Sequence, residues 1–224
     1  MKRRAIAPPT LIMIKVNEFF TSIQGESTWA GVPCFFVRLT GCNLSCNYCD
    51  TQYALKEGTD YAVDDIVKKV AAEKAPLVEI TGGEPLLQRE TPLLASALIK
   101  AGHTVLVETN GTLDISMLPA GAIRIMDIKC PDSGNDIPFL ETNLTHLCRN
   151  DECKMVISSK EDFTWALDFV HEHGLHRKCT VIFSPNTACV PPRDLAGWIL
   201  DAHAPVRLGL QLHKILWGDA ARGV

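Results

Sequence analysis

The segments Cys34-Phe35-Phe36-Val37-Arg38-Leu39 and Gly41-Cys42-Asn43-Leu44-Ser45-Cys46-Asn47-Tyr48-Cys49-Asp50-Thr51 are almost contiguous and are the most informative part of this chain. Residues 34–39 are mostly apolar and aromatic and lie between turn-forming residues, which predicts a buried strand. The cysteine-rich residues 41–51 follow this strand. Because open α/β sheets bind ligands at the carboxyl ends of their strands, we expect residues 41–51 to form a ligand-binding loop.

The thiols of Cys42, Cys46 and Cys49 are close enough in sequence for one loop to bring them to a single inorganic centre. Cys thiolates hold iron–sulfur clusters, and three local ligands would leave one iron of a [4Fe–4S] cluster open for chemistry. Cys34 and Cys130 are candidates for a fourth ligand, although their spacing does not single them out. The alternative is a structural zinc site, but zinc prefers four ligands, often in two separated pairs, and no second pair is evident.

Length and composition favour one globular domain with a substantial core. The 224 residues are 46% hydrophobic and 21% charged, and the formal net charge is -4. Basic stretches are short and scattered, so we expect no nucleic-acid partner. The nine cysteines are odd in number and do not resemble a disulfide framework, which favours a reducing cytoplasm.

Residues 1–12 are interpreted as a disordered extension, and residues 13–224 as a single domain. The apolar run that ends at Ile14 contains two prolines and is followed by Lys15. It is too short and too broken for a signal peptide or a membrane span, so we expect no association with a membrane.

Strands alternate with helices along the chain, which indicates a parallel sheet built from crossover units. Further strands are expected at 77–80, 104–108, 123–128, 154–157 and 180–183, with an edge strand at 206–211. Helices are expected at 62–73, 86–101, 158–174 and 193–201. A closed eight-unit barrel takes about 250 residues, so six units in this chain predict an α/β fold with an open, partial (β/α)6 barrel. Segments 110–123 and 130–152 are poor in helix signal, and we expect those crossovers to lack helices.

Two motifs resemble those of the radical S-adenosylmethionine superfamily: the three cysteines with Tyr48 before the last one, and Thr81-Gly82-Gly83-Glu84-Pro85 after the second strand. Further segments resemble the 7-carboxy-7-deazaguanine synthase family within it. These are 20–26, Arg38, 49–51, 108–112, 127–131 and 211–214. The resemblance implies a partial barrel of the radical S-adenosylmethionine type. It also implies conversion of 6-carboxy-tetrahydropterin to 7-carboxy-7-deazaguanine, on the route to queuosine and other deazapurines.

The resemblance implies a [4Fe–4S] cluster on Cys42, Cys46 and Cys49, whose open iron is chelated by S-adenosylmethionine. The adenosyl radical would abstract hydrogen from substrate C6, and a rearrangement would contract the ring with loss of ammonia. No catalytic residue is expected beyond those that hold the cofactors. The implied cofactor contacts are Tyr48, Cys49, Asp50, Gly83, Glu84, Lys129, Ser158 and Lys160. For Glu84 the alternative is an ordinary turn near a helix N-terminus.

Thr51 resembles the magnesium ligand of the family, and Mg²⁺ accepts few protein oxygens. The alternative is a local hydrogen bond that closes the loop. Arg38 is charged within an apolar strand, and the resemblance implies a pair with the substrate carboxylate. A structural ion pair is the alternative. The implied substrate contacts are Ile23, Gln24, Gly25, Glu26, Arg38, Thr81, Glu108 and His213.

The resemblance also implies a flavodoxin- or ferredoxin-type reductant and a homodimer. One rival function is a glycyl-radical-enzyme activase, which predicts a large apolar docking surface and no pocket for a small substrate. A second rival is a non-enzymatic module that binds zinc or a cluster.

Overall fold

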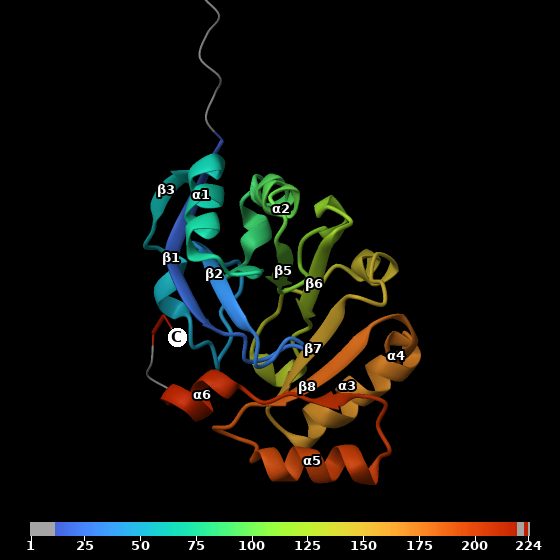
Figure 1. Ribbon diagram of the computed structural model, residues 1–224. Coiled ribbons are helices and arrows are strands. Elements are labelled where there is room, and N and C mark those ends of the chain that lie inside the picture. The colour runs from blue at the N-terminus through green and yellow to red at the C-terminus, as the bar shows by residue number, and fades with distance from the viewer. Residues whose placement is uncertain (1–11, 219–221, 224) are drawn as a thin grey trace, which may run out of the picture.

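The computed structural model describes residues 12–218 and 222–223. Its centre is one nine-stranded sheet with the order β3-β1-β2-β4-β5-β6-β7-β8-β9, which curves into an open barrel (Figure 1). The strands are β1 (Met13–Ile23), β2 (Pro33–Leu39), β3 (Thr59–Ala62), β4 (Leu77–Gly82), β5 (Thr104–Thr109), β6 (Ala122–Asp127), β7 (Glu152–Ile157), β8 (Thr180–Pro185) and β9 (Arg207–Leu208). The expected extension 1–12 falls almost wholly outside the described residues.

The expected fold class is confirmed. Strands β2 and β4 to β8 pair in parallel, and β9 adds the predicted short edge strand. Strands β1 and β3 extend the other edge in antiparallel fashion, which the sequence patterns did not predict.

The α-helices are α1 (Val63–Glu73), α2 (Thr91–Lys100), α3 (Lys160–Glu172), α4 (Leu175–Lys178), α5 (Pro192–Asp201) and α6 (Leu212–Trp217). Helix α2 begins five residues later than the predicted start at Leu86. Residues 85–87 form a separate short 3-10 turn instead, because the Glu84 carboxylate caps the Leu86 N–H at 2.9 Å. Helix α2 then begins at Thr91 and has a proline in its first turn. The proline is tolerated there because the first N–H groups of a helix have no partner within the helix.

The two crossovers expected to lack helices do lack them: β5 to β6 and β6 to β7 contain only short 3-10 turns. The fully buried Asn143 supplies hydrogen bonds there that a helix would otherwise make internally. Its Nδ2 donates to the carbonyls of Gly111 (2.9 Å) and Leu113 (2.8 Å), and its Oδ1 accepts from the Ile115 N–H (3.1 Å). One side chain therefore joins the two irregular connections.

The main core lies between the sheet and the helices, and a smaller apolar cluster fills the base of the barrel interior. Cys34, Phe36, Leu77, Leu106 and Ile125 form this interior cluster. Side chains alternate along each strand, so polar residues two positions further along point into the barrel above the cluster. The barrel is therefore apolar at its base and polar toward the carboxyl ends of the strands.

The connection between β1 and β2 links the two sides of the open barrel. The Thr28 N–H and hydroxyl both donate to Glu152 on β7, and the Leu212 N–H donates to the Gly25 carbonyl at 3.1 Å. This crossing loop, residues 24–32, brings the N-terminal strands, β7 and the C-terminal segment together beside the interior.

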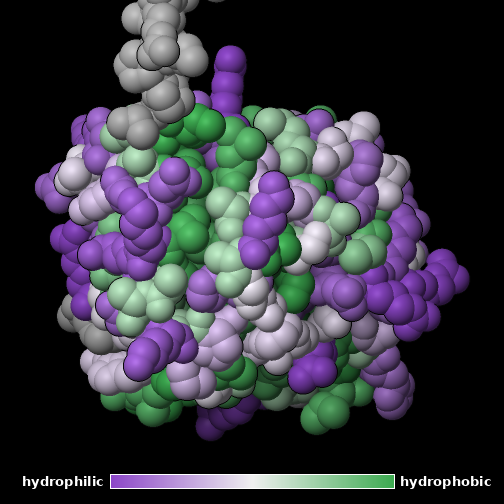
Figure 2. Space-filling view, turned by 45° about the horizontal axis from the view of Figure 1, so that its top comes forward, coloured by the Kyte–Doolittle hydropathy of each residue, from purple (hydrophilic) through white to green (hydrophobic). Residues whose placement is uncertain are grey.

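Within the described residues, no helix combines the length and apolar character that crossing a bilayer requires. On the face shown in Figure 2, hydrophobic and hydrophilic side chains are interspersed, as is usual for protein surfaces.

Candidate active site

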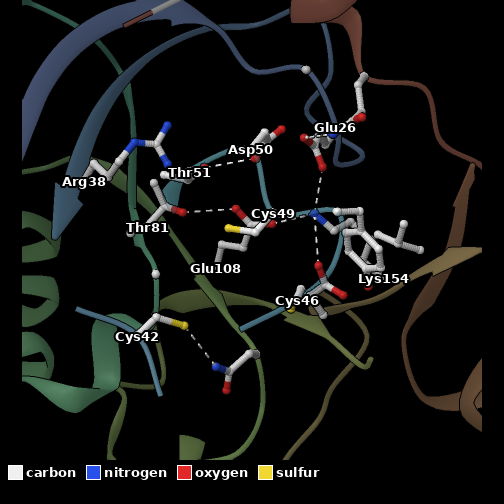
Figure 3. Close-up of a pocket in the computed structure, with 18 of the residues that line it drawn as sticks. Glu26, Arg38, Cys42, Cys46, Cys49, Asp50, Thr51, Thr81, Glu108 and Lys154 are labelled. Atoms are coloured by element: carbon white, nitrogen blue, oxygen red, sulfur yellow. Dashed lines mark hydrogen bonds and ion pairs between the residues drawn. The ribbon is translucent and has the colours of Figure 1, made fainter. Parts of the chain in front are cut away.

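A cavity of about 470 Å³ opens at the carboxyl ends of the parallel strands (Figure 3). Its walls come from the crossing loop, the cysteine loop (residues 41–51), the ends of β4 to β8 and the C-terminal segment (residues 211–214). Sixteen of the residues predicted for the site line it: Ile23, Gln24, Gly25, Glu26, Arg38, Cys42, Cys46, Tyr48, Cys49, Asp50, Thr51, Thr81, Gly83, Glu108, Lys129 and His213. A pocket of this size suits a small substrate together with a cofactor.

The cysteine loop is held by hydrogen bonds from the β6–β7 connection. The Asn47 N–H donates to the Ser133 carbonyl at 3.0 Å, and the Ser45 N–H donates to Asn135 Oδ1 at 2.9 Å. Asn135 Nδ2 in turn donates to Cys46 Sγ at 3.0 Å. The positions of the thiols are therefore set by a segment about 90 residues downstream, which is the separation of Ser45 and Asn135.

The thiols of Cys42, Cys46 and Cys49 all line the cavity, and they are soft donors of the kind that hold iron–sulfur clusters. In the described ranges, no three His, Cys, Asp or Glu side chains lie close enough together to hold one ion. The candidates for a fourth ligand, Cys34 and Cys130, are buried and do not line the cavity. Burial raises the pKa of Cys42 and Cys49, so these thiols favour the neutral form until a metal centre binds.

Three buried polar atoms at the cavity have no partner among the described residues: the Tyr48 hydroxyl, Asp127 Oδ1 and Ser184 Oγ. Buried polar groups are normally paired, so atoms of this kind mark places where a ligand supplies the partner. Together with the three soft thiol donors, they fit a bound cluster and a polar cofactor.

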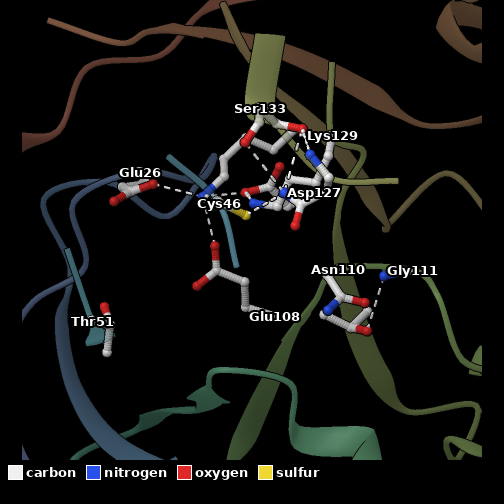
Figure 4. A network of polar contacts seen from close by, with 12 residues as sticks. Glu26, Cys46, Thr51, Glu108, Asn110, Gly111, Asp127, Lys129 and Ser133 are labelled. Atoms are coloured by element: carbon white, nitrogen blue, oxygen red, sulfur yellow. Dashed lines mark hydrogen bonds and ion pairs between the residues drawn. The ribbon is translucent and has the colours of Figure 1, made fainter. Parts of the chain in front are cut away.

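Lys154 on β7 is the centre of an ionic network in the barrel. Its ammonium group lies 2.6 Å from Glu108 and 2.7 Å from Glu26 (Figure 3). It also lies 3.5 Å from Asp127, which Lys129 contacts at 2.8 Å (Figure 4). Burial alone would raise the pKa of Glu26, but Lys154 lowers it to about 2. Glu26 is therefore held as a carboxylate, which accepts hydrogen bonds only, and Glu108 pairs with the same ammonium group.

Gln24 and Glu79 form the floor of the cavity beside this network. Gln24 Oε1 accepts the N–H groups of Glu26 (2.9 Å) and Ser27 (3.0 Å), and Gln24 Nε2 donates to Glu79 at 3.0 Å. Burial and the nearby charge of Glu108 raise the pKa of Glu79 to about 8. Gln24, predicted as a substrate contact, thus also anchors the crossing loop.

Arg38 makes the structural ion pair that was the alternative for it. Its Nε donates to Glu18 at 2.8 Å, and the Tyr53 hydroxyl donates to the same carboxylate oxygen at 2.7 Å. The terminal guanidinium nitrogens bond to no described residue, and Arg38 lines the cavity. The ion pair therefore leaves the outer edge of the guanidinium available for an anion.

Thr51 is the last residue of the cysteine loop and faces the cavity (Figure 3). Its hydroxyl donates to Asp50 Oδ1 at 3.0 Å and makes no capping bond to the following turn. Lys214 reaches Asp50 at 3.4 Å, and His213 Nδ1 lies 3.9 Å from Glu26. The C-terminal segment therefore closes one side of the cavity.

Glu84 is predicted to contact the cofactor, and its side chain is fully buried. Its carboxylate is 0% exposed and accepts hydrogen bonds from the Leu86 and Asn110 N–H groups and the Thr109 hydroxyl, at 2.7–2.9 Å. It is not among the residues that line the cavity, so its contact with a cofactor stays a prediction. Glu84 joins the loops that follow β4 and β5, while Gly83 faces the cavity.

Ser158 and Lys160 are not among the residues that line the cavity, so their contacts with the cofactor stay predictions. The Lys160 ammonium lies over the rings of Phe163 (4.5 Å) and Trp198 (4.6 Å). The Ser158 hydroxyl accepts from Asn186 Nδ2 at 3.2 Å, and Asn186 takes its place in the cavity wall.

Lys154 and Glu79 were missed by the sequence analysis. Each is a charged residue inside an apolar strand, which is the signal that identified Arg38. A charge within an apolar strand is therefore the signal in the sequence that points to both residues.

Comparisons with known proteins agree with this site. A model of the radical SAM superfamily matches residues 36–185. The 7-carboxy-7-deazaguanine synthases of Koribacter versatilis and Chlorobaculum tepidum are 43% and 46% identical to this chain. Each alignment covers 94% of this chain, and 100% and 97% of the relative.

The crystal structure of QueE from Escherichia coli superimposes with a TM-score of 0.72 at 21% identity, covering 89% of this chain and 94% of that chain. This likeness concerns the fold. The activase alternative has no support from these relatives. The chain therefore belongs to the radical SAM superfamily and, within it, to the family of the 7-carboxy-7-deazaguanine synthases.

Proposed function

We propose that this chain converts 6-carboxy-5,6,7,8-tetrahydropterin to 7-carboxy-7-deazaguanine by radical ring contraction with loss of ammonia. The reaction belongs to queuosine and 7-deazapurine biosynthesis and is a carbon–nitrogen lyase reaction. The observation that carries the proposal is one cavity in which three thiols meet a set of pterin-compatible polar groups. The family relationship supplies the identity of the reaction.

Cys42, Cys46 and Cys49 would hold the cluster, and Tyr48, Asp50, Gly83 and Lys129 line the space beside it. When bound, the [4Fe–4S] cluster and S-adenosylmethionine supply the radical that abstracts hydrogen. The protein contributes the position of the substrate and the exclusion of water.

The other side of the cavity suits the substrate. Glu26 and Glu108 accept hydrogen bonds from ring N–H groups, and the free edge of Arg38 can pair with the substrate carboxylate. Thr51 would place Mg²⁺ against that same carboxylate. Ile23, Gly25, Thr81 and His213 complete the walls.

We further propose a flavodoxin- or ferredoxin-type reductant, a homodimeric assembly and a cytoplasmic location. A cluster held by free thiolates requires a reducing environment and an electron donor.

The test is an anaerobic assay of the reconstituted enzyme with the pterin substrate, S-adenosylmethionine, Mg²⁺ and dithionite. Formation of 7-carboxy-7-deazaguanine and ammonia, with about four irons per chain, is expected. Cys42→Ser should lose both iron and product. Cys189→Ser is the matched control, since Cys189 is an exposed free thiol that does not line the cavity, and it should keep both. An iron-loaded enzyme that cleaves S-adenosylmethionine but forms no deazapurine would refute the assignment.

A further inference from the structure

Glu79 is a buried carboxyl group, and no cation of the described residues forms an ion pair with it. It lies on β4 at 2% exposure, and its side chain faces the barrel interior between Leu77 and Thr81. Lys154 and Lys129 contact three other carboxylates, those of Glu26, Glu108 and Asp127, and Glu79 makes no ion pair with either lysine.

Together with Glu79, this network holds more carboxyl groups than lysine ammonium groups. A buried ionised carboxylate without a partner cation is costly, and the least expensive solution is for one carboxyl group to keep its proton. Glu79 is the group without a cation, and its pKa is raised to about 8 accordingly. The groups that face it are Gln24 and Glu26 from the crossing loop, Cys34 on β2, Glu108 on β5 and Lys154 on β7.

The hydrogen bonds of Glu79 leave one oxygen for the cavity. Gln24 Nε2 donates to Glu79 Oε2 at 3.0 Å, and Gln24 is itself fixed because its oxygen accepts two backbone N–H groups. Glu79 Oε1 bonds to no described residue, and Glu79 lines the cavity floor. A protonated Glu79 therefore presents an O–H donor to the cavity.

We propose that Glu79 is a further substrate-contacting residue, a neutral carboxylic acid whose O–H donates to an acceptor atom of the bound ring. This inference rests on the proposed function, because a pterin or deazapurine edge offers both N–H donors and a carbonyl acceptor. Glu26 and Glu108 can only accept hydrogen bonds, and Lys154 is engaged by carboxylates. Glu79 supplies the complementary donor. The site therefore matches a ring edge that carries both hydrogen-bond donors and an acceptor, and it disfavours a ring edge that carries only donors.

The test measures equilibrium binding of 7-carboxy-7-deazaguanine to the anaerobic, cluster-loaded enzyme with S-adenosylmethionine present. At pH 7, Glu79→Gln should bind the product with an affinity within about threefold of that of the original chain. The amide keeps both an acceptor for the Gln24 N–H and a donor for the ring. Glu79→Leu should weaken binding about 10- to 100-fold, since it leaves the ring acceptor unpaired. Affinity for S-adenosylmethionine should not change in either variant.

The pH profile separates a proton-bearing contact from a structural one. Between pH 7 and 9 the original enzyme should lose about tenfold in affinity as Glu79 ionises, because the donor is replaced by a second negative charge beside Glu108. The affinity of Glu79→Gln for the product should change much less over the same pH range. The comparison cancels any titration of the ligand and does not depend on the folding of Glu79→Leu.

Glu152→Leu is the control for loop anchoring. Glu152 is also a buried glutamate that holds the crossing loop, through Thr28, but it does not line the cavity. The Glu152→Leu variant should bind the product with an affinity within about threefold of that of the original chain. The inference is overturned if Glu152→Leu weakens binding as much as Glu79→Leu, or if Glu79→Gln follows the pH profile of the original enzyme. It is also overturned if the original enzyme binds the product and Glu79→Leu binds it equally well. An original enzyme that neither binds nor forms the deazapurine refutes the proposed function instead.

Discussion

Replacing Lys154 by methionine tests whether the ionic network holds the barrel interior together. Methionine keeps an unbranched apolar stem of similar length and removes only the ammonium group. The Lys154 side chain is 6% exposed and contacts Glu108 at 2.6 Å and Glu26 at 2.7 Å. Removing it leaves two adjacent, partly buried carboxylates without their common cation.

The expected loss in the free energy of unfolding at pH 7 is about 3–5 kcal/mol, the usual cost of removing one partner from a buried ion pair. The pKa of Glu26 gives a consistent figure. Its change from 4.5 to about 2 corresponds to roughly 3 kcal/mol of preferential stabilisation of the carboxylate. This stabilisation is fully present above pH 4.5 and is lost as the pH falls from 4.5 toward 2, because the folded pKa is depressed.

The assay is urea unfolding of the full chain, followed by tryptophan fluorescence at pH 7 and pH 5. In Lys154→Met, burial without the cation raises the pKa values of the nearby carboxyl groups. Protonation then removes their charge more easily, so the loss in free energy of unfolding relative to the original chain should be smaller at pH 5 than at pH 7. Glu26→Gln in the Lys154→Met background should restore more than about 1 kcal/mol, as expected for residues in one network. Lys68→Met is the matched control, because Lys68 pairs with Asp65 at the exposed surface and its loss should leave the unfolding midpoint unchanged. A Lys154→Met variant that unfolds like the original chain at pH 7, or whose deficit does not shrink at pH 5, would refute the reasoning.

Three further substitutions follow from the packing. Gly83→Ala should lower the iron bound after reconstitution while the chain stays folded, because an added Cβ would collide with the Cys42 side chain; full iron loading would contradict this. Gly197→Ala in α5 should raise the free energy of unfolding by about 0.5–1 kcal/mol, since nothing lies within 4 Å of the new methyl group, and a fall in urea midpoint would contradict it. Glu84→Gln should lower the free energy of unfolding by about 1–3 kcal/mol, because an amide N–H₂ would replace an oxygen that now accepts from buried donors such as the Asn110 N–H; an unchanged urea midpoint would contradict it.

Local patterns in the sequence determined the parallel strands, most of the helices and the place of the cysteine loop. They also indicated that the two crossovers without helix periodicity would be irregular. These features depend on the spacing of apolar residues and on cysteines only a few positions apart, both of which are readable within a short window. The antiparallel strand β3 (Thr59–Ala62) escaped because it is short and has a mostly exposed pattern.

Only the tertiary structure decided which polar side chains face the cavity and what state they adopt there. Glu84 and Lys160 share the strand-end positions of true cavity residues, yet one is saturated by backbone donors and the other lies over aromatic rings. Lys154 and Glu79 become significant because residues far apart in the chain surround them. A charge balance depends on three-dimensional neighbours and on burial, and neither is encoded in any one stretch of sequence.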